Sequence, residues 1–156
     1  ITWHFIGHLQ TNKVKYIAPF VQLIHAVDSF KLLKEINKQA LKNKRVINCL
    51  LQIKIAEENT KFGLSNTEAE AILHKEQVQE FKGISIVGLM GMASNTSNEE
   101  QVSNEVNALK VFYERCAAVN HNLSILSIGM SGDFKLAIQE GSTMVRIGST
   151  IFGERN

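Results

Sequence analysis

Six short apolar runs, separated by stretches with a helical period, restrict the fold of this chain more than any other feature of its sequence. The runs span residues 2–9, 22–28, 46–55, 84–92, 123–130 and 143–149. Most are nearly continuous in apolar residues, which is typical of parallel strands covered on both faces. Strands that alternate with helices in this way predict an α/β protein with a parallel sheet. The spacing leaves open a doubly wound sheet and part of a (β/α)8 barrel.

The stretches between the runs carry the stripes and end signals of helices. Capping boxes are predicted at Ser65 with Glu68 and at Ser97 with Glu100, and Gly141 is predicted to end the helix of residues 133–140. Apolar stripes fall in residues 29–44 and 98–119, and each predicts a helix with one buried face. The members are Leu33, Ile36 and Ala40 in the first stripe and Val102, Val106, Leu109, Tyr113 and Cys116 in the second.

The composition is that of an ordinary globular domain. The chain has 156 residues, of which 44% are hydrophobic and 21% charged, and its net charge is +2. So small a charge gives no reason to expect nucleic acid or an anionic membrane as a partner. No apolar run approaches the roughly 20 residues that cross a bilayer. Cys49 and Cys116 are predicted to be buried free thiols, which favours a cytoplasmic protein.

Small and polar residues follow the last two apolar runs, where either candidate fold places its ligand. After the fifth run, Gly129 permits close backbone approach, and Ser131 is predicted at the N-cap of the next helix, beside unpaired N–H groups. A plain serine cap is the alternative for Ser131. After the sixth run, residues 148–150 offer free N–H groups and two hydroxyls, which suit a phosphate. Together the two strand ends predict a ligand that carries a phosphate.

Arg146 lies in the middle of the sixth run, where its buried charge needs a compensating partner. Strand alternation places Met144, Arg146 and Gly148 on one face and Val145 on the other. The partner of the guanidinium is an anionic ligand, a hydrogen-bond acceptor or an internal carboxylate. The carboxylates at other strand ends are those of Asp28, Glu57 and Glu58.

Other candidate groups are explained without chemistry. His4 and His8 lie in the first run and lack a third ligand at metal spacing, so packing or hydrogen bonding is predicted in place of zinc. Lys54, in the third run, is predicted to extend to solvent rather than to form an imine. The chain has no serine-hydrolase elbow, Walker loop or dinucleotide fingerprint. We therefore assign no catalytic residue and no metal site.

Five segments resemble the pyridoxal phosphate homeostasis proteins, single-domain proteins related to the barrel domain of alanine racemase. The segments are WHFIGHLQTNK, LLQIKIAEENTKFGL, GLMGMA, LSIGMSGDF and GSTMVRIGSTIFGERN. They run in the family's order over essentially the whole chain, and the last two are highly specific. The resemblance implies a (β/α)8 TIM barrel of PLP fold type III, which binds pyridoxal 5′-phosphate (PLP) at the C-terminal ends of its strands.

Carried over on the matching motifs, the resemblance implies a cofactor site of five residues. Ser131, Gly148 and Ser149 hold the phosphate, Arg146 faces the pyridine nitrogen, and Met130 lies close to the cofactor. An arginine at that nitrogen keeps it unprotonated, which weakens the ring as an electron sink. The family implies a carrier or regulator of vitamin B6, not an enzyme, with PLP-dependent apoenzymes as recipients of PLP.

The chain departs from the family pattern at its start. The family's Schiff-base lysine lies upstream of the first run and hence outside this chain, and Lys54 falls on a different strand. Because the first run begins at once, without an initiator methionine, we expect a truncated barrel domain over residues 1–156 that supplies strands three to eight. Its two open sheet edges are expected to favour self-association. The alternative function, a PLP-dependent amino-acid racemase, needs an acid–base tyrosine, yet Tyr16 and Tyr113 both lie in helical stretches.

Overall fold

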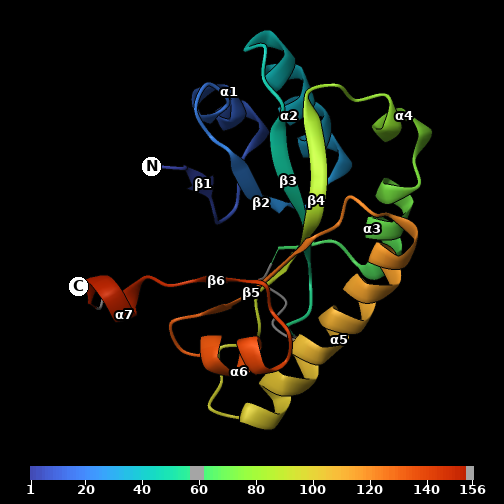
Figure 1. Cartoon of the computed structure of the whole chain (residues 1–156). Coiled ribbons are helices and arrows are strands. Elements are labelled where there is room, and N and C mark those ends of the chain that lie inside the picture. The colour runs from blue at the N-terminus through green and yellow to red at the C-terminus, as the bar shows by residue number, and fades with distance from the viewer. Residues whose placement is uncertain (57–61, 154–156) are drawn as a thin grey trace.

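The computed structural model describes residues 1–56 and 62–153 and alternates strands with helices along the chain (Figure 1). The predicted α/β class is confirmed, and each of the six apolar runs contains a strand shorter than the run itself. The elements are β1 (His4–Phe5), a 3-10 helix η1 (Thr11–Lys13), α1 (Val14–Ile17), β2 (Leu23–Val27), α2 (Phe30–Lys42), β3 (Ile47–Ile53), α3 (Asn66–Leu73), α4 (Glu76–Gln79), β4 (Ile84–Gly91), α5 (Glu99–Val119), β5 (Ile125–Met130), α6 (Phe134–Gln139), β6 (Met144–Arg146) and α7 (Ser149–Phe152).

The strands form one parallel sheet in which each strand pairs with the next along the chain, in the order β1-β2-β3-β4-β5-β6. A doubly wound sheet reverses its strand order near the middle, whereas a (β/α)8 barrel keeps sequence order. The observed order therefore identifies a half-barrel of six βα units. In the described part of the chain, β1 and β6 are the two edge strands, and Figure 1 shows them near the two chain ends, away from α3 and α5.

Most of the apolar core lies between the sheet and the helices that cover it. Strand residues Ile24, Leu51 and Leu89 belong to this cluster and are fully shielded from solvent. Both predicted helical stripes are confirmed, because all their members are buried except Tyr113, which is partly buried and packs against the same cluster. In the amphipathic helix α2, Ser29 caps the first turn by accepting a hydrogen bond from the N–H of Leu32.

A smaller apolar cluster lies on the other face of the sheet, which is the interior face in a barrel. Met144 packs against this cluster, whereas a methyl of Val145 approaches Gly129 and Ala137 on the helix-covered side. The predicted alternation of β6 is therefore confirmed for these side chains. The buried members of the inner cluster are Leu23, Ala26, Leu50 and Met90.

The predicted helix ends are confirmed in two places and corrected in one. Ser65 and Glu68 form a complete capping box, and Gly141 follows α6 with a positive φ of 104°. The box predicted at Ser97 is wrong, because Asn98 is the N-cap of α5 and accepts a hydrogen bond from the N–H of Gln101. Asparagine caps as well as serine does, and here it directly precedes the first helical residue.

Both cysteines are free and buried, as predicted. Burial raises the pKa of the Cys49 thiol and, to a smaller extent, that of Cys116, so both thiols stay protonated and unreactive. Within residues 1–56 and 62–153, the helices are all too short or too polar to span a membrane.

Candidate ligand site at the carboxyl ends of β5 and β6

The carboxyl ends of β5 and β6 bring together residues that lie far apart in the sequence. The hydroxyl oxygen of Ser131, just after β5, accepts hydrogen bonds from the N–H of Gly148 at 3.1 Å and from the N–H of Thr150 at 3.3 Å. The prediction that Ser131 is an N-cap is wrong, because α6 begins later, after Asp133. The Asp133 carboxylate instead accepts the N–H of Met130 at 2.6 Å, which closes the turn. Ser131 therefore does not cap α6, and its hydrogen bonds link the end of β5 to the residues that follow β6.

Gly148 offers its backbone to open space. A Cβ atom built on this residue meets no heavy atom within 4 Å, and both Gly148 and Ser149 are exposed. Packing within the protein therefore does not explain a glycine at this position. A ligand that approaches the backbone N–H closely does explain it, since a side chain would occupy the same space.

Arg146 points toward neutral acceptors on the inner face of the sheet. Its Nη1 donates to the carbonyl oxygen of Ser127 at 3.0 Å and to the hydroxyl of the same residue at 2.8 Å. Its Nη2 donates to the carbonyl oxygen of Gly91 at 3.0 Å. Burial lowers the pKa of Arg146, and the charge of Asp133 opposes that shift. A guanidinium stays protonated in proteins, and this one has three of its five N–H donors bonded to described residues.

The structure also tests the carboxylate partners considered for Arg146. Asp28 lies 3.1 Å from Nδ1 of His8 and bonds to that imidazole instead. Glu57 and Glu58 lie outside the described residues. Of the predicted kinds of partner, the arginine thus meets hydrogen-bond acceptors without charge, which leaves its positive charge uncompensated by any ion pair among the described residues.

Met130 is the last residue of β5 and pairs in register with Arg146 on β6. Its side chain is exposed at this end of the sheet. The five residues predicted for the cofactor site, Met130, Ser131, Arg146, Gly148 and Ser149, therefore all lie at or just beyond the carboxyl ends of two adjacent strands.

Sequence reasoning missed a polar chain that continues from Arg146 across the inner face. The Ser127 hydroxyl lies 3.0 Å from Nδ1 of His25, and Nε2 of His25 lies 3.3 Å from Nδ1 of His4. Burial lowers the pKa of His25, and the charges of Arg146 and His4 add to this effect, so that together they bring it from 6.5 to about 4. The only signal in the sequence is a histidine and a serine inside otherwise apolar runs, and strand register decides that they meet.

The groups set aside on sequence grounds behave as predicted. Lys54 is exposed to solvent. His4 bonds to His25, and the ring of His8 stacks on that of Phe62 with a centroid separation of 3.9 Å. In the described part of the chain, three or more histidine, cysteine or acidic side chains nowhere gather as a metal site requires.

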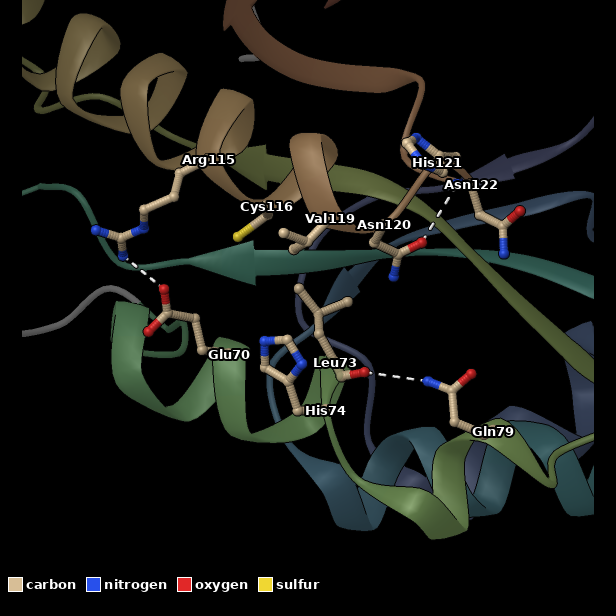
Figure 2. A pocket seen from close by; sticks show the side chains of 10 residues that line it. All are labelled: Glu70, Leu73, His74, Gln79, Arg115, Cys116, Val119, Asn120, His121 and Asn122. Atoms are coloured by element: carbon tan, nitrogen blue, oxygen red, sulfur yellow. Dashed lines mark hydrogen bonds and ion pairs between the residues drawn. The ribbon is translucent and has the colours of Figure 1, made fainter.

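Of two cavities of similar size, one lies beside the candidate site and the other lies away from it. One of about 650 Å³ adjoins the contact between Ser131 and Thr150 and is also lined by Lys135. The other, of about 640 Å³, lies between α3 and the end of α5, and Figure 2 shows Arg115 paired there with Glu70 at 2.6 Å. Because its residues 120–122 precede β5, this second cavity lies at the amino end of that strand, away from the candidate site.

The ordered parallel half-barrel and its donor-lined strand ends define the class of this protein, a (β/α)-barrel protein with a candidate ligand site at the carboxyl ends of its strands. The model of the family "Alanine racemase, N-terminal domain" matches residues 2–156. The chain is 40% identical to the pyridoxal phosphate homeostasis protein of Aquifex aeolicus, over 99% of this chain and 68% of that protein. The chain therefore belongs to the alanine racemase N-terminal domain family and, within it, to the pyridoxal phosphate homeostasis proteins.

Other relatives agree with this assignment. The pyridoxal phosphate homeostasis protein of Escherichia coli K12 is 33% identical over 100% of this chain and 66% of its own length. The structure of PipY from Synechococcus elongatus with PLP bound is 28% identical, with a TM-score of 0.87 over 98% of this chain and 71% of that one. An alanine racemase of Clostridium difficile, 14% identical with a TM-score of 0.74, shows the fold alone. The chain spans about two thirds of the length of these curated relatives.

Proposed function

We propose that this chain binds PLP at the carboxyl ends of β5 and β6 and serves PLP homeostasis without catalysing a reaction. The observation that carries the proposal is the meeting of Ser131 with the N–H groups of Gly148 and Thr150, just beyond the half-buried Arg146 at the end of β6. Relatives named pyridoxal phosphate homeostasis proteins and the PLP-bound structure of PipY support it.

The donors at the strand ends fit the phosphate of PLP. Backbone N–H groups and a hydroxyl are typical ligands of a phosphate, and here they come from Ser131, Gly148 and Ser149. In the ligand-free chain the Gly148 N–H donates to the Ser131 oxygen, and a bound phosphate oxygen would replace that acceptor. The open space at Gly148 leaves room for the phosphate oxygens. Lys135, exposed in the adjoining cavity, adds a positive charge that attracts the dianion.

Arg146 fits the pyridine nitrogen at the other end of the cofactor. A guanidinium can only donate hydrogen bonds, so it binds this nitrogen in its unprotonated, accepting form. PLP supplies an electron sink when its ring nitrogen is protonated, and Arg146 opposes that state. We infer that the site holds the cofactor while restraining its reactivity, as suits a carrier. Met130, in register with Arg146, lies beside the ring.

The racemase alternative is disfavoured by the positions of the two tyrosines. The hydroxyl of Tyr113 donates to the carbonyl oxygen of Leu123 at 3.4 Å, just before β5 and hence at the wrong end of that strand. Tyr16 is exposed on α1. Neither tyrosine supplies an acid–base group at the carboxyl ends of the strands.

The partners and the setting of the protein are part of the same proposal. We infer that PLP-dependent apoenzymes receive the cofactor in the cytoplasm, where the two free thiols remain reduced.

Self-association is a further part of the proposal. Exposed apolar side chains near both edge strands favour contacts between copies of the chain at these edges. These side chains are Trp3 and Ile6 beside β1 and Ile151 and Phe152 beyond β6. Sedimentation at increasing protein concentration tests this, and a monomer throughout contradicts it.

Binding of ligands that lack one part of PLP tests which residues hold its phosphate and which residue faces its ring nitrogen. Pyridoxine 5′-phosphate, pyridoxine and inorganic phosphate lack the aldehyde, so adducts with lysines do not interfere. Ser131→Ala is expected to weaken both phosphate-bearing ligands roughly tenfold and to leave pyridoxine unchanged. Arg146→Gln is expected to weaken pyridoxine and its phosphate but not inorganic phosphate.

The matched control is Ser124→Ala, an exposed serine at the opposite end of β5. Calorimetry on the three variants is expected to show no change for this control. If Ser131→Ala and Arg146→Gln weaken all three ligands equally, or none of them, the assignment of the two ends is wrong.

A further inference from the structure

The hydrogen bonds around Ser127 satisfy its buried hydroxyl in one direction only. Arg146 can only donate, so the Ser127 oxygen accepts from Nη1 at 2.8 Å. If Nδ1 of His25, 3.0 Å away, also donated to this oxygen, the hydroxyl proton of the fully buried Ser127 would have no acceptor among the described residues, so we assign that proton to Nδ1. Nδ1 of His25 is therefore the acceptor in this contact and carries no proton.

The same reasoning extends to the next histidine. His25 is 1% exposed, and its lowered pKa of about 4 keeps the imidazole neutral at ordinary pH. A neutral imidazole with an unprotonated Nδ1 carries its proton on Nε2. Nε2 therefore donates to Nδ1 of His4 at 3.3 Å. Protons thus point in one direction along the inner face, from Arg146 through Ser127 and His25 to His4.

We propose that His25 is a positioning residue for Arg146: by accepting the Ser127 proton, it turns the Ser127 oxygen toward the guanidinium and so orients the arginine toward the ring nitrogen of the cofactor. The last clause rests on the proposed function, whereas the direction of the hydrogen bonds does not. His25 reaches across the inner face from β2, and its contact with Ser127 joins residues 102 positions apart. Local sequence around Arg146 could not supply this support.

A proton on His25 reverses the arrangement. An imidazolium donates from both nitrogens, so Nδ1–H and Arg146 then both donate to the Ser127 oxygen, and the Ser127 proton loses its acceptor. The charged or titratable side chains that act on His25 from other strands are Arg146 on β6 and His4 on β1, and both oppose its protonation. The neutral state of His25 and the orientation of Arg146 therefore depend on each other.

Nitrogen NMR of the ligand-free protein tests the direction of the chain. With 15N-labelled histidine, His25 is expected to show an unprotonated Nδ1 and a protonated Nε2 from pH 8 down to about pH 5, in line with its lowered pKa. A proton on Nδ1 at neutral pH overturns the proposal. A histidine that merely fills space carries no requirement for one tautomer, so this signature separates positioning from packing.

Two variants of similar size test the positioning role. His25→Asn keeps an acceptor oxygen near the place of Nδ1, whereas His25→Leu does not. The leucine variant is expected to bind pyridoxine 5′-phosphate on the order of tenfold more weakly, while the asparagine variant retains most of the affinity. Inorganic phosphate is expected to bind both variants as it binds the wild type. Equal losses in the two variants, or no loss in either, overturn the proposal.

Two further outcomes remain decisive. If His25→Leu does not fold, Ser127→Ala removes the hydroxyl that links His25 to Arg146 with a smaller change in volume, and unchanged binding of pyridoxine 5′-phosphate by that variant overturns the proposal. If the wild-type protein binds no pyridoxine 5′-phosphate, the proposed function fails, and the tautomer of His25 in the ligand-free protein alone decides its place in the chain.

Discussion

Gly148→Ala should separate ligand binding from stability. The new Cβ meets no atom within 4 Å in an exposed position, so we expect the free energy of unfolding to change by no more than about 0.5 kcal/mol. The same methyl group fills the space proposed for the phosphate, beside the Gly148 N–H that a phosphate oxygen would take over from the Ser131 oxygen. Loss of one hydrogen bond to a charged group costs about 1.5–3 kcal/mol, which corresponds to at least a roughly tenfold weaker affinity.

The matched control is Gly129→Ala on the neighbouring strand. Gly129 has a φ of 104°, and a Cβ there lies 2.7 Å from the Cβ of Ala137 and 3.2 Å from the Cα of Phe134. Strain and overpacking are expected to lower the free energy of unfolding by about 1–3 kcal/mol. Urea titration measures stability and calorimetry with inorganic phosphate measures binding. The reasoning is refuted if Gly148→Ala binds phosphate like the wild type, or if it is destabilised as much as the control.

Three further predictions concern stability and covalent chemistry. Glu105→Ala is expected to lower the free energy of unfolding by about 2–3 kcal/mol in urea titration, because the buried carboxylate accepts both the N–H and the hydroxyl of Ser94 at 2.7 Å. The pKa of His25 is lowered from 6.5 to about 4 in the folded chain, so between these pH values only the unfolded chain binds the proton. The free energy of unfolding should therefore fall by roughly 3 kcal/mol as the pH falls from about 6.5 to 4. His25→Asn should lack this pH dependence, and an equal slope in both proteins would contradict the assignment. Borohydride reduction with PLP, followed by peptide mapping, should label no lysine of residues 1–156 stoichiometrically, and one fully labelled lysine would disprove this.

The strands and helical stripes could be predicted because their signals are local. Continuous apolar runs and the i, i+3, i+4 pattern report the average environment of each segment. Helix ends were less certain where two good capping residues are adjacent, as with Ser97 and Asn98. The choice between barrel and doubly wound sheet depended on strand order, which runs of apolar residues do not encode.

The candidate site shows the same difference between what the local sequence predicts and what the strand order decides. The need for a partner of Arg146 follows from the cost of a buried charge, and the sequence alone predicts it. The identity of that partner does not follow, because the carbonyl oxygen of Gly91 and the hydroxyl of Ser127 reach the guanidinium only through the pairing of β4, β5 and β6. The contact of His25 with Ser127 could not be predicted from the sequence for the same reason.

The neutral surroundings of Arg146 connect the two parts of the proposed function, cofactor binding and the lack of catalysis. A pocket that stabilises a protonated pyridine needs a carboxylate at the ring nitrogen, and this arginine has neutral acceptors at its Nη atoms and a neutral His25 beyond them. The net positive charge at that end favours the unprotonated ring, while donors at Ser131 and Gly148 suit the phosphate at the other end. The two features proposed to bind the cofactor thus also disfavour its electron-sink state. The proposed binding without catalysis therefore follows from one arrangement of charges, and a variant that places a carboxylate at position 146 should reverse the ring preference while leaving phosphate binding in place.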